Sequence, residues 1–192
     1  MNTSALRKSR LKPMWLLLLL VATSCLAPGS PTAGASPAIN TEYKVKATCL
    51  FHFAQFVEWP ALAFADPAAP LTIGVLGQNE FGTFLDGLIK GETIKGHPIV
   101  IHRAQKLAEL PACHILFISK SAKAEIPQIL ASVAHSSVLT VSEVEGFARS
   151  GGIINFCVQD GKVRFGINLP VSQSKGLKIS AQLMQLSEKG CL

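Results

Sequence analysis

The chain has 192 residues, of which 18 are Lys or Arg and 12 are Asp or Glu, so its formal net charge is +6. Residues 1–35 hold four of the basic residues and none of the acidic ones, which leaves residues 36–192 with 14 basic and 12 acidic residues, a charge of +2. The high charge therefore belongs mostly to the N-terminal segment, and without a later Lys/Arg cluster a nucleic-acid-binding function is excluded.

The first 35 residues predict a signal peptide and a flexible leader. A basic stretch at 7–12 precedes an unbroken apolar run at 14–22, and small, turn-forming residues follow. The run is about half of the ~20 residues that a membrane-spanning helix needs, so an uncleaved anchor is the less favoured alternative. Cys25 is a candidate for lipid modification, although Ala22 stands where a lipoprotein signal usually has Leu. We expect export to the periplasm.

Residues 40–192 are expected to form one α/β domain. Apolar residues recur at helical spacing from Thr41 until Pro60 ends the helix, and Asn40 or Thr41 can cap its start. Short apolar runs and amphipathic stretches then alternate, and predict strands at 71–77, 98–101, 114–118 and 138–141 and helices at 81–91 and 126–133. This alternation predicts a mostly parallel sheet with helices on both faces.

The C-terminal part has a different pattern. Two apolar segments, 153–158 and 163–169, flank an Asp160-Gly161 turn, which is typical of a β-hairpin. A last helix is expected from about Val171 to Lys189.

Motifs for catalysis, metal binding or cofactor binding are missing from the sequence. The five histidines form no paired metal-ligand motif, and Ser150 is not part of a Gly-x-Ser-x-Gly elbow. The few carboxylates are scattered, so no general acid and base can be paired. We therefore expect a protein that is not an enzyme and has no metal or cofactor.

The end of the first helix is rich in aromatic residues. Together with Phe64, its rings cannot easily all face one core, and such a surplus suits a hydrophobic partner groove. The predicted partner-binding residues are Phe53, Phe56, Trp59 and Pro60. The alternative is that the rings pack beneath the Pro/Ala-rich connector at 61–70.

A glycine-rich loop at 145–152 is a second candidate site. It follows the fourth predicted strand, at the carboxyl edge of the sheet, where α/β proteins tend to bind ligands. The candidate ligand-binding residues are Phe147, Gly151, Gly152 and Arg164. A mobile turn without a ligand is the alternative.

Four cysteines follow the leader: Cys49, Cys113, Cys157 and Cys191. An oxidising compartment permits disulfides among them, and three complete pairings are open. Buried free thiols are an equally good interpretation. The wide spacing, with no Cys-x-x-Cys, argues against a zinc knuckle or a thioredoxin-like redox pair.

Several segments, in order and spacing, resemble the YfiR/HmsC-like family of periplasmic regulatory proteins from Glu42 to the C-terminus. These segments are 42–47 (EYKVKA), 53–60 (FAQFVEWP), 73–77, 112–118, 146–148, 151–156 and 163–169. The resemblance implies a homodimeric, non-enzymatic regulator that binds and represses the sensor domain of an inner-membrane signalling protein. For the family's namesake this partner is a diguanylate cyclase. When the regulator releases the cyclase, the cyclic-di-GMP level rises and biofilm formation is promoted. A periplasmic small-ligand-binding protein is the alternative function.

The resemblance also implies disulfides whose redox state tunes release. Relatives often pair a cysteine in the first strand with the cysteine of the Cys-His strand. In this sequence Cys113 is present, but Gly74 stands in the place of its partner. The usual bridge therefore cannot form, and Cys113 is left to pair with Cys49 or Cys191 or to stay free.

Overall fold

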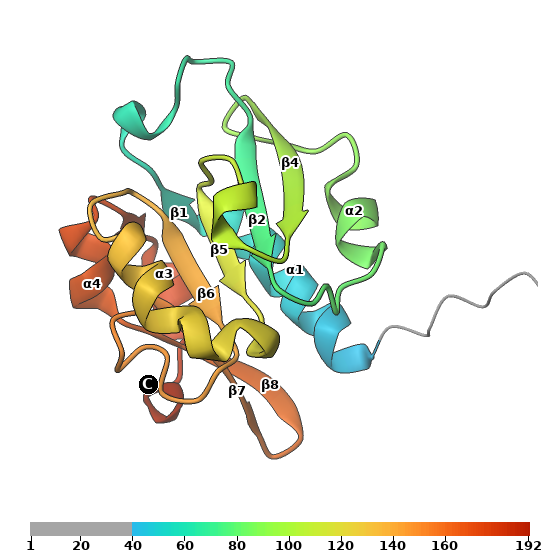
Figure 1. Ribbon diagram of the computed structural model, residues 1–192, viewed down its shortest axis with the longest axis vertical. Helices are drawn as coiled ribbons and strands as arrows, with labels where there is room; N and C mark the ends of the chain where they lie inside the picture. Colours follow the sequence, from blue (N-terminus) through green and yellow to red (C-terminus); the bar gives the residue numbers. More distant parts are fainter. Residues whose placement is uncertain (1–39) are drawn as a thin grey trace, which may run out of the picture. The chain divides into compact units, whose positions relative to one another are not determined.

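A mostly parallel sheet of seven strands lies at the centre of the protein in the computed structural model, which describes residues 40–192 (Figure 1). The predicted signal peptide and Cys25 lie outside the described residues. The strand order is β3-β4-β2-β5-β6-β7-β8. In chain order the strands are β2 (Leu71–Leu76), β3 (Thr93–Ile94), β4 (His97–Ala104), β5 (Ile115–Ile118), β6 (Leu139–Ser142), β7 (Ile154–Gln159) and β8 (Lys162–Ile167).

The pairing within this sheet confirms the predicted α/β class. Strands β4, β2, β5, β6 and β7 are parallel, while β3 and β8 are antiparallel edge strands. The β7–β8 hairpin turns at Asp160 and Gly161, both with positive φ, as the Asp-Gly signal predicts. The central strands β2 and β5 are buried along their whole length because helices cover both of their faces.

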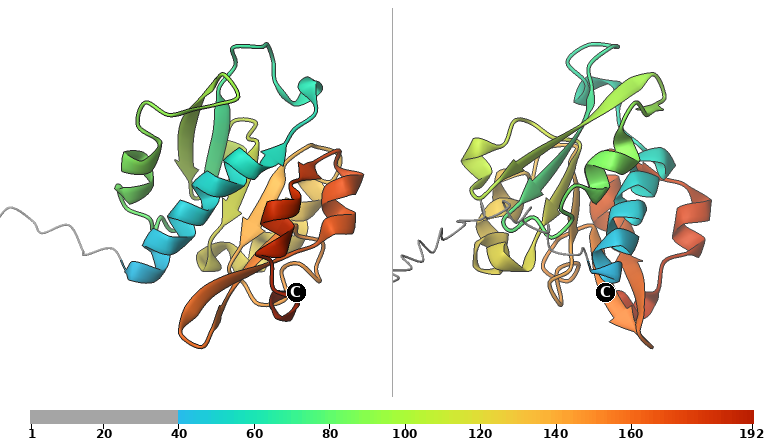
Figure 2. Two further views of the ribbon diagram at one scale, coloured as in Figure 1. Left: turned by 180° about the vertical axis from the view of Figure 1, so that it is seen from behind. Right: turned by 90° about the vertical axis from the view of Figure 1, so that its right-hand side faces the viewer.

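Helices cover the two faces of the sheet unequally (Figures 1 and 2). One face packs against α1 (Thr41–Phe56), α2 (Phe84–Ile89), α4 (Leu169–Ser174) and α5 (Ala181–Gln185), and the other against α3 (Ile126–Ser132). Side chains alternate along each strand, so Val75 lies in the core beneath α1 and Leu76 in the core beneath α3. Among residues 40–192, no helix combines the length and apolarity needed to cross a membrane.

Helix α1 crosses the sheet and sets the position of the aromatic segment. Asn40 caps its start, because the side-chain oxygen accepts a hydrogen bond from the Glu42 amide at 3.0 Å. The helix ends at Phe56, four residues before Pro60, because the chain turns into the short strand β1 (Val57–Glu58). Strand β1 pairs antiparallel with β9 (Lys178–Ile179).

The predicted helix from Val171 to Lys189 is wrong. That segment forms α4, β9, α5 and a 3₁₀ turn, η4 (Lys189–Cys191). Gly176 adopts a φ of 71°, which ends α4, and the pairing of β9 with β1 extends the next residues. Ser180 then caps α5 by accepting a hydrogen bond from the Leu183 amide at 3.2 Å. Tertiary pairing thus overrides the local helical pattern.

Candidate functional site

The predicted partner-binding residues at the end of α1 divide between core and surface. Phe53 is only 1% exposed and packs between the rings of Phe156 and Phe165, with centroid distances of 5.7 and 5.1 Å. Phe53 therefore packs mainly in the core, and its ring also lines a hollow between α1 and α5. Phe56, Trp59 and Pro60 are half-buried, so part of each side chain is accessible.

The connector between β1 and β2 is held by stacked rings. The ring of Phe64 lies between those of His97 and His114, with centroid distances of 3.9 and 4.3 Å. The Trp59 indole donates a hydrogen bond to the carbonyl of His114 at 3.2 Å. Trp59 and Phe64 therefore pack with the connector, which is the alternative interpretation of this aromatic segment.

His114 joins the connector to the sheet. Its Nδ1 accepts a hydrogen bond from the Thr72 amide at 3.0 Å, and its Nε2 lies 3.1 Å from the carbonyl oxygen of Ala63. These partners require a neutral ring with its proton on Nε2, which donates to Ala63. Burial lowers the pKa of His114 and so favours this neutral form.

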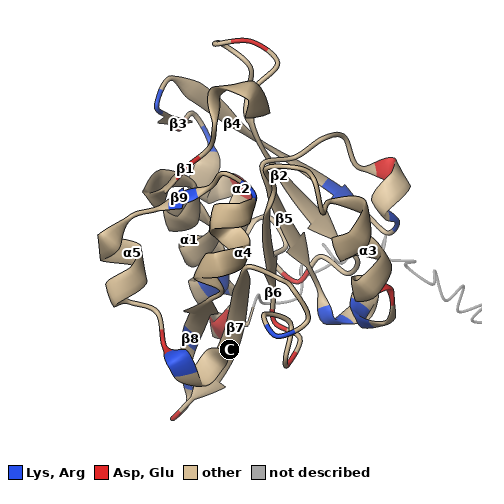
Figure 3. Cartoon of the chain, turned by 90° about the vertical axis from the view of Figure 1, so that its left-hand side faces the viewer, with Lys and Arg blue, Asp and Glu red and all other residues tan. Residues whose placement is uncertain are grey.

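Three hollows surround the end of α1, where α1, α5, β1 and β9 lie together (Figure 3). The first, of about 400 Å³, is lined by Trp59 and Phe64, with the exposed Lys95–Glu58 ion pair (3.3 Å) at its rim. The second, of about 210 Å³, lies between α1 and α5 and is almost wholly apolar.

A third hollow, of about 360 Å³, joins the other two. It shares Glu58 and Lys95 with the first hollow and Phe56 with the second. Neighbouring hollows thus share lining residues, and we name the three together the α1-end surface. Its main apolar side chains are Phe56, Trp59, Phe64, Leu183 and Leu186.

A charged cavity of about 380 Å³ lies beyond the carboxyl ends of β5 and β6. Its walls include Lys46 of α1, which is almost fully buried and forms ion pairs with Glu143 and Glu42. The Tyr43 hydroxyl donates to Glu143 at 2.8 Å. Burial and the adjacent Glu143 carboxylate raise the pKa of Tyr43, so this hydroxyl stays protonated. Among residues 40–192, no group of three or more His, Cys, Asp or Glu side chains is placed to hold a metal ion.

The predicted ligand-binding residues do not form the walls of this cavity. Phe147 is buried beneath Gly152, where a Cβ would overlap the phenylalanine ring. Gly151 and Arg164 also lie outside the cavity lining, whereas Arg149 from the same glycine-rich loop contributes to it. The predicted ligand-binding residues stay a prediction, and the loop residues that line this cavity are Glu145, Gly146 and Arg149.

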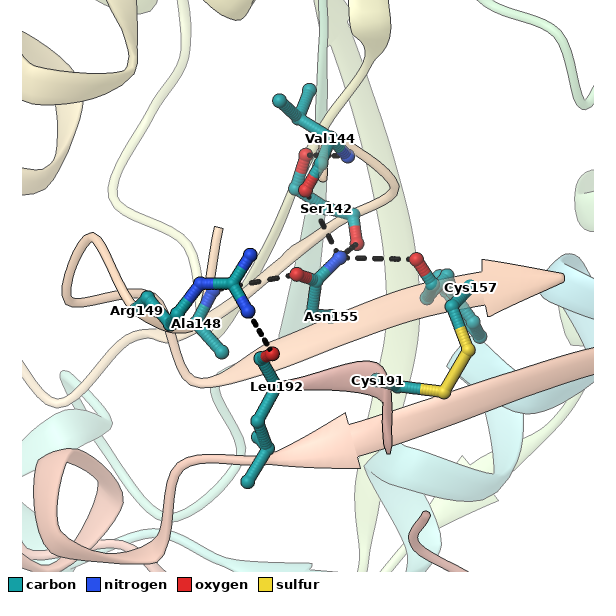
Figure 4. Close-up of a disulfide and its surroundings, with 9 residues drawn as sticks. Ser142, Val144, Ala148, Arg149, Asn155, Cys157, Cys191 and Leu192 are labelled. Carbon is teal, nitrogen blue, oxygen red and sulfur yellow. Dashed lines mark hydrogen bonds between the residues drawn. A yellow bond between two sulfur atoms is a disulfide. The ribbon is translucent and has the colours of Figure 1, made fainter. Parts of the chain in front are cut away.

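Asn155 of β7 fixes the glycine-rich loop (Figure 4). Its amide nitrogen donates to the carbonyls of Val144 at 3.0 Å and Ser142 at 3.4 Å, and its oxygen accepts from the Ala148 amide at 3.5 Å. Arg149 donates to the Leu192 carbonyl at 2.7 Å across the cavity mouth. These bonds hold the loop in one conformation at the cavity wall.

A family model described as YfiR/HmsC-like matches residues 43–188. The chain belongs to the YfiR/HmsC-like family. The match begins in α1 and ends beyond α5, so it includes the whole α1-end surface.

One solved structure, a conserved domain protein from Vibrio cholerae O1 biovar El Tor, is also similar to this YfiR/HmsC-like chain. The sequence identity is 12% and the TM-score is 0.49, over 76% of this chain. The chain spans 58% of the length of that structure.

Two of the four cysteines in this YfiR/HmsC-like domain form a disulfide, and the other two are thiols. Cys157 and Cys191 form a disulfide between β7 and η4, with 5.5 Å between their Cα atoms (Figure 4). Cys49 and Cys113 form no disulfide within residues 40–192, so neither pairing that the sequence left open for Cys113 is made there. Burial raises the pKa of each thiol to about 11, which keeps both protonated and poorly reactive at neutral pH.

Sequence reasoning missed His114 and Lys46, and the sequence holds a signal for each. Lys46 precedes the buried Leu50 and Phe53 by four and seven residues, so it lies on the core-facing stripe of α1. A lysine on such a stripe indicates a buried ion pair. His114 directly precedes a buried strand, and this position indicates a buried, hydrogen-bonded histidine.

Proposed function

We propose that this chain is a non-enzymatic periplasmic regulator that binds and represses the sensor domain of an inner-membrane signalling protein, a diguanylate cyclase. Membership of the YfiR/HmsC-like family supports a regulatory role, and the N-terminal pattern predicts export. The observation that carries the proposal is the α1-end surface, where apolar hollows are bordered by accessible Phe56 and Leu186.

This surface has the physical features of a protein-binding site. Hollows lined by aromatic and aliphatic side chains accept the anchoring residues that dominate binding energy. Helices α4 and α5 contain no charged residues (Figure 3), and no Asp, Glu, Lys or Arg side chain lines the second hollow. A partner domain would therefore bind mainly by burying apolar side chains. The homodimer implied by the family resemblance is part of the same proposal.

Replacing Phe56 by Glu tests the proposal. A carboxylate in the second hollow must be desolvated when the partner binds, so repression should be lost and cyclic-di-GMP should rise to the level of cells lacking the chain. Trp59 is left unchanged, because its indole also donates a hydrogen bond to the His114 carbonyl, so replacing it would also disturb the structure. The measurements are cellular cyclic-di-GMP and the melting temperature of the purified variant.

The control is Val45→Glu on the same helix. Val45 is 41% exposed and lies about three turns from Phe56, outside all three hollows. It should keep wild-type cyclic-di-GMP. Wild-type signalling in a folded Phe56→Glu protein would show that the partner binds elsewhere.

The charged cavity favours a second candidate function, the binding of a small ligand. Its volume lies within the range of about 300–1,000 Å³ that is usual for ligand pockets, and it presents Lys120 and Arg149 beside Glu143. Phe56 is not among its lining residues. A protein that works only through this cavity would therefore keep its function in the Phe56→Glu variant, which separates the two candidates.

A further inference from the structure

Trp59 and the connector that follows it form a wall of the α1-end surface, and the His114 ring ties this wall to the sheet. His114 spans the gap between Ala63 in the 3₁₀ turn η1 (Ala61–Ala63) and Thr72 in β2. Phe64 stacks on the same ring, and Trp59 is bonded to the same residue's carbonyl. Among residues 40–192, no other side chain is hydrogen-bonded both to the connector and to the start of β2.

The two ring bonds exist together only in the neutral ring. In the neutral ring, Nδ1 accepts from Thr72 while Nε2–H donates to Ala63. The imidazolium carries a proton on each nitrogen, so its Nδ1–H would face the Thr72 N–H, donor against donor. Protonation therefore removes the Thr72 bond and leaves a buried amide without its acceptor.

From this geometry we propose that His114 is a proton-operated latch, which holds the connector against the sheet at neutral pH (the closed state) and releases it in acid. Any effect of this latch on partner binding rests on the proposed function. The latch itself does not, because it concerns contacts within this chain only.

Two imidazole rings contact the connector, and of these only His114 is also hydrogen-bonded to β2. His97 lies on the opposite face of Phe64, and its Nδ1 is 2.6 Å from the carbonyl oxygen of Ala69. Glu58 is paired with Lys95, and Asp66 accepts a hydrogen bond from the Ala68 amide. Cys113 and His135 line the hollow on the other side. Among residues 40–192, no carboxylate forms an ion pair with His114.

The direction of the pH effect follows from the two states. Burial lowers the pKa of His114 in the closed state, whereas a released, solvated ring has a pKa of about 6.5. The free-energy preference for the closed state is therefore complete above about pH 6.5. It is lost as the pH falls from that value through the lower pKa of the closed state. When the connector is released, the first hollow loses its Trp59 and Phe64 wall.

The fluorescence emission of Trp59 reports directly whether the connector is held or released. The chain has two tryptophans, Trp15 and Trp59, so a full-length Trp15→Phe variant has a single fluorophore at the connector. Titration from pH 8 to pH 4.5 should shift its emission in one step, with a midpoint at or below about 6.5. In the same background, His114→Asn keeps an oxygen acceptor for Thr72 but cannot titrate, so the step should disappear. His135→Asn, an exposed histidine, should keep it.

Persistence of the step in His114→Asn would overturn the proposal. If that variant fails to fold, nuclear magnetic resonance of the wild-type chain decides. Protonation of the His114 ring should coincide with loss of hydrogen-exchange protection at the Thr72 amide, after correction for the intrinsic rate. An unchanged Thr72 protection factor across the His114 titration also overturns it. Neither readout needs a partner, so failure of the proposed function would leave these results unaffected.

Discussion

Gly74 lies in the middle of β2, with Cys113 beside it. A Cβ built on Gly74 would lie 3.3 Å from the Cys113 Sγ and at the same distance from side-chain carbons of Leu110 and Leu116. In a disulfide, standard bond lengths and angles place the Cβ of one cysteine about 3 Å from the Sγ of the other. The position of Gly74 therefore matches the missing half of the bridge that the family resemblance implies.

Gly74→Cys should form a disulfide with Cys113 in air. The bridge closes a loop of roughly 40 residues, which stabilises by up to about 4 kcal/mol in the chain-entropy model, less the cost of moving Leu110 and Leu116. The expected result is one fewer titratable thiol than in the wild type and a higher melting temperature under oxidising conditions. Gly74→Ser, which adds similar bulk without a thiol, measures the packing cost alone. A thiol count one above the wild type would contradict the predicted geometry.

Lys46 and His114 show how far single residues could be predicted from the sequence. The helical stripe marks Lys46 as buried, but its partner Glu143 is 97 residues away, and no local pattern connects them. Likewise, the hydrogen bonds of His114 reach Ala63 and Thr72, 51 and 42 residues away. Polar contacts of this kind form only in the folded chain. The sequence can therefore predict which side chains act as donors or acceptors, but not which partners they bind.

At the scale of elements, the C-terminal segment covers the edge of the sheet. The Glu188 amide donates to the Phe165 carbonyl of β8 at 2.8 Å, and Cys191 is bonded to Cys157 of β7. Gly166 permits this approach, because a Cβ there would lie 3.0 Å from the Cys191 carbonyl carbon. The C-terminal segment thus occupies part of this edge, and covering an edge is a common protection of edge strands.

Cys191→Ser should destabilise the protein by about 3–4 kcal/mol, because the bridge links residues 34 apart and restricts the unfolded chain. Denaturant unfolding without reductant measures the change, and the wild type with reductant should lose a similar amount. Cys49→Ser is the control, since Cys49 forms no disulfide within residues 40–192. Equal unfolding midpoints for Cys191→Ser and the oxidised wild type would show that the bridge does not form.

The elements themselves were predictable where the apolar pattern decides the structure. The apolar runs became strands β2, β5 and β6, which are buried along their whole length, and the run at 98–101 became part of the longer β4, in which only Ile99 is buried. The last helix was wrong because β9 pairs with β1, more than 100 residues earlier, and this pairing interrupts a helical pattern that is locally sound.

At the scale of the whole molecule, α1 separates the two candidate sites. Lys46 in the charged cavity and Phe56 in the α1-end surface are about 15 Å apart along the helix axis. The α/β class follows from the alternation of strand and helix patterns. The α1-end surface does not, because α1, the connector, β9 and α5 meet only in the folded chain.

Leu186→Asp tests whether this distant segment belongs to the partner surface. Leu186 is 66% exposed and lines the second hollow, so the change should leave the melting temperature nearly unaltered. It should weaken binding to the partner's sensor domain by at least about tenfold, because a carboxylate would be desolvated at an apolar contact. Val158→Asp on the hairpin is the control, since Val158 is 54% exposed and lines the charged cavity instead. Titration calorimetry gives both affinities, and equal weakening by the two variants would mean that added charge, and not the α1-end surface, accounts for the loss.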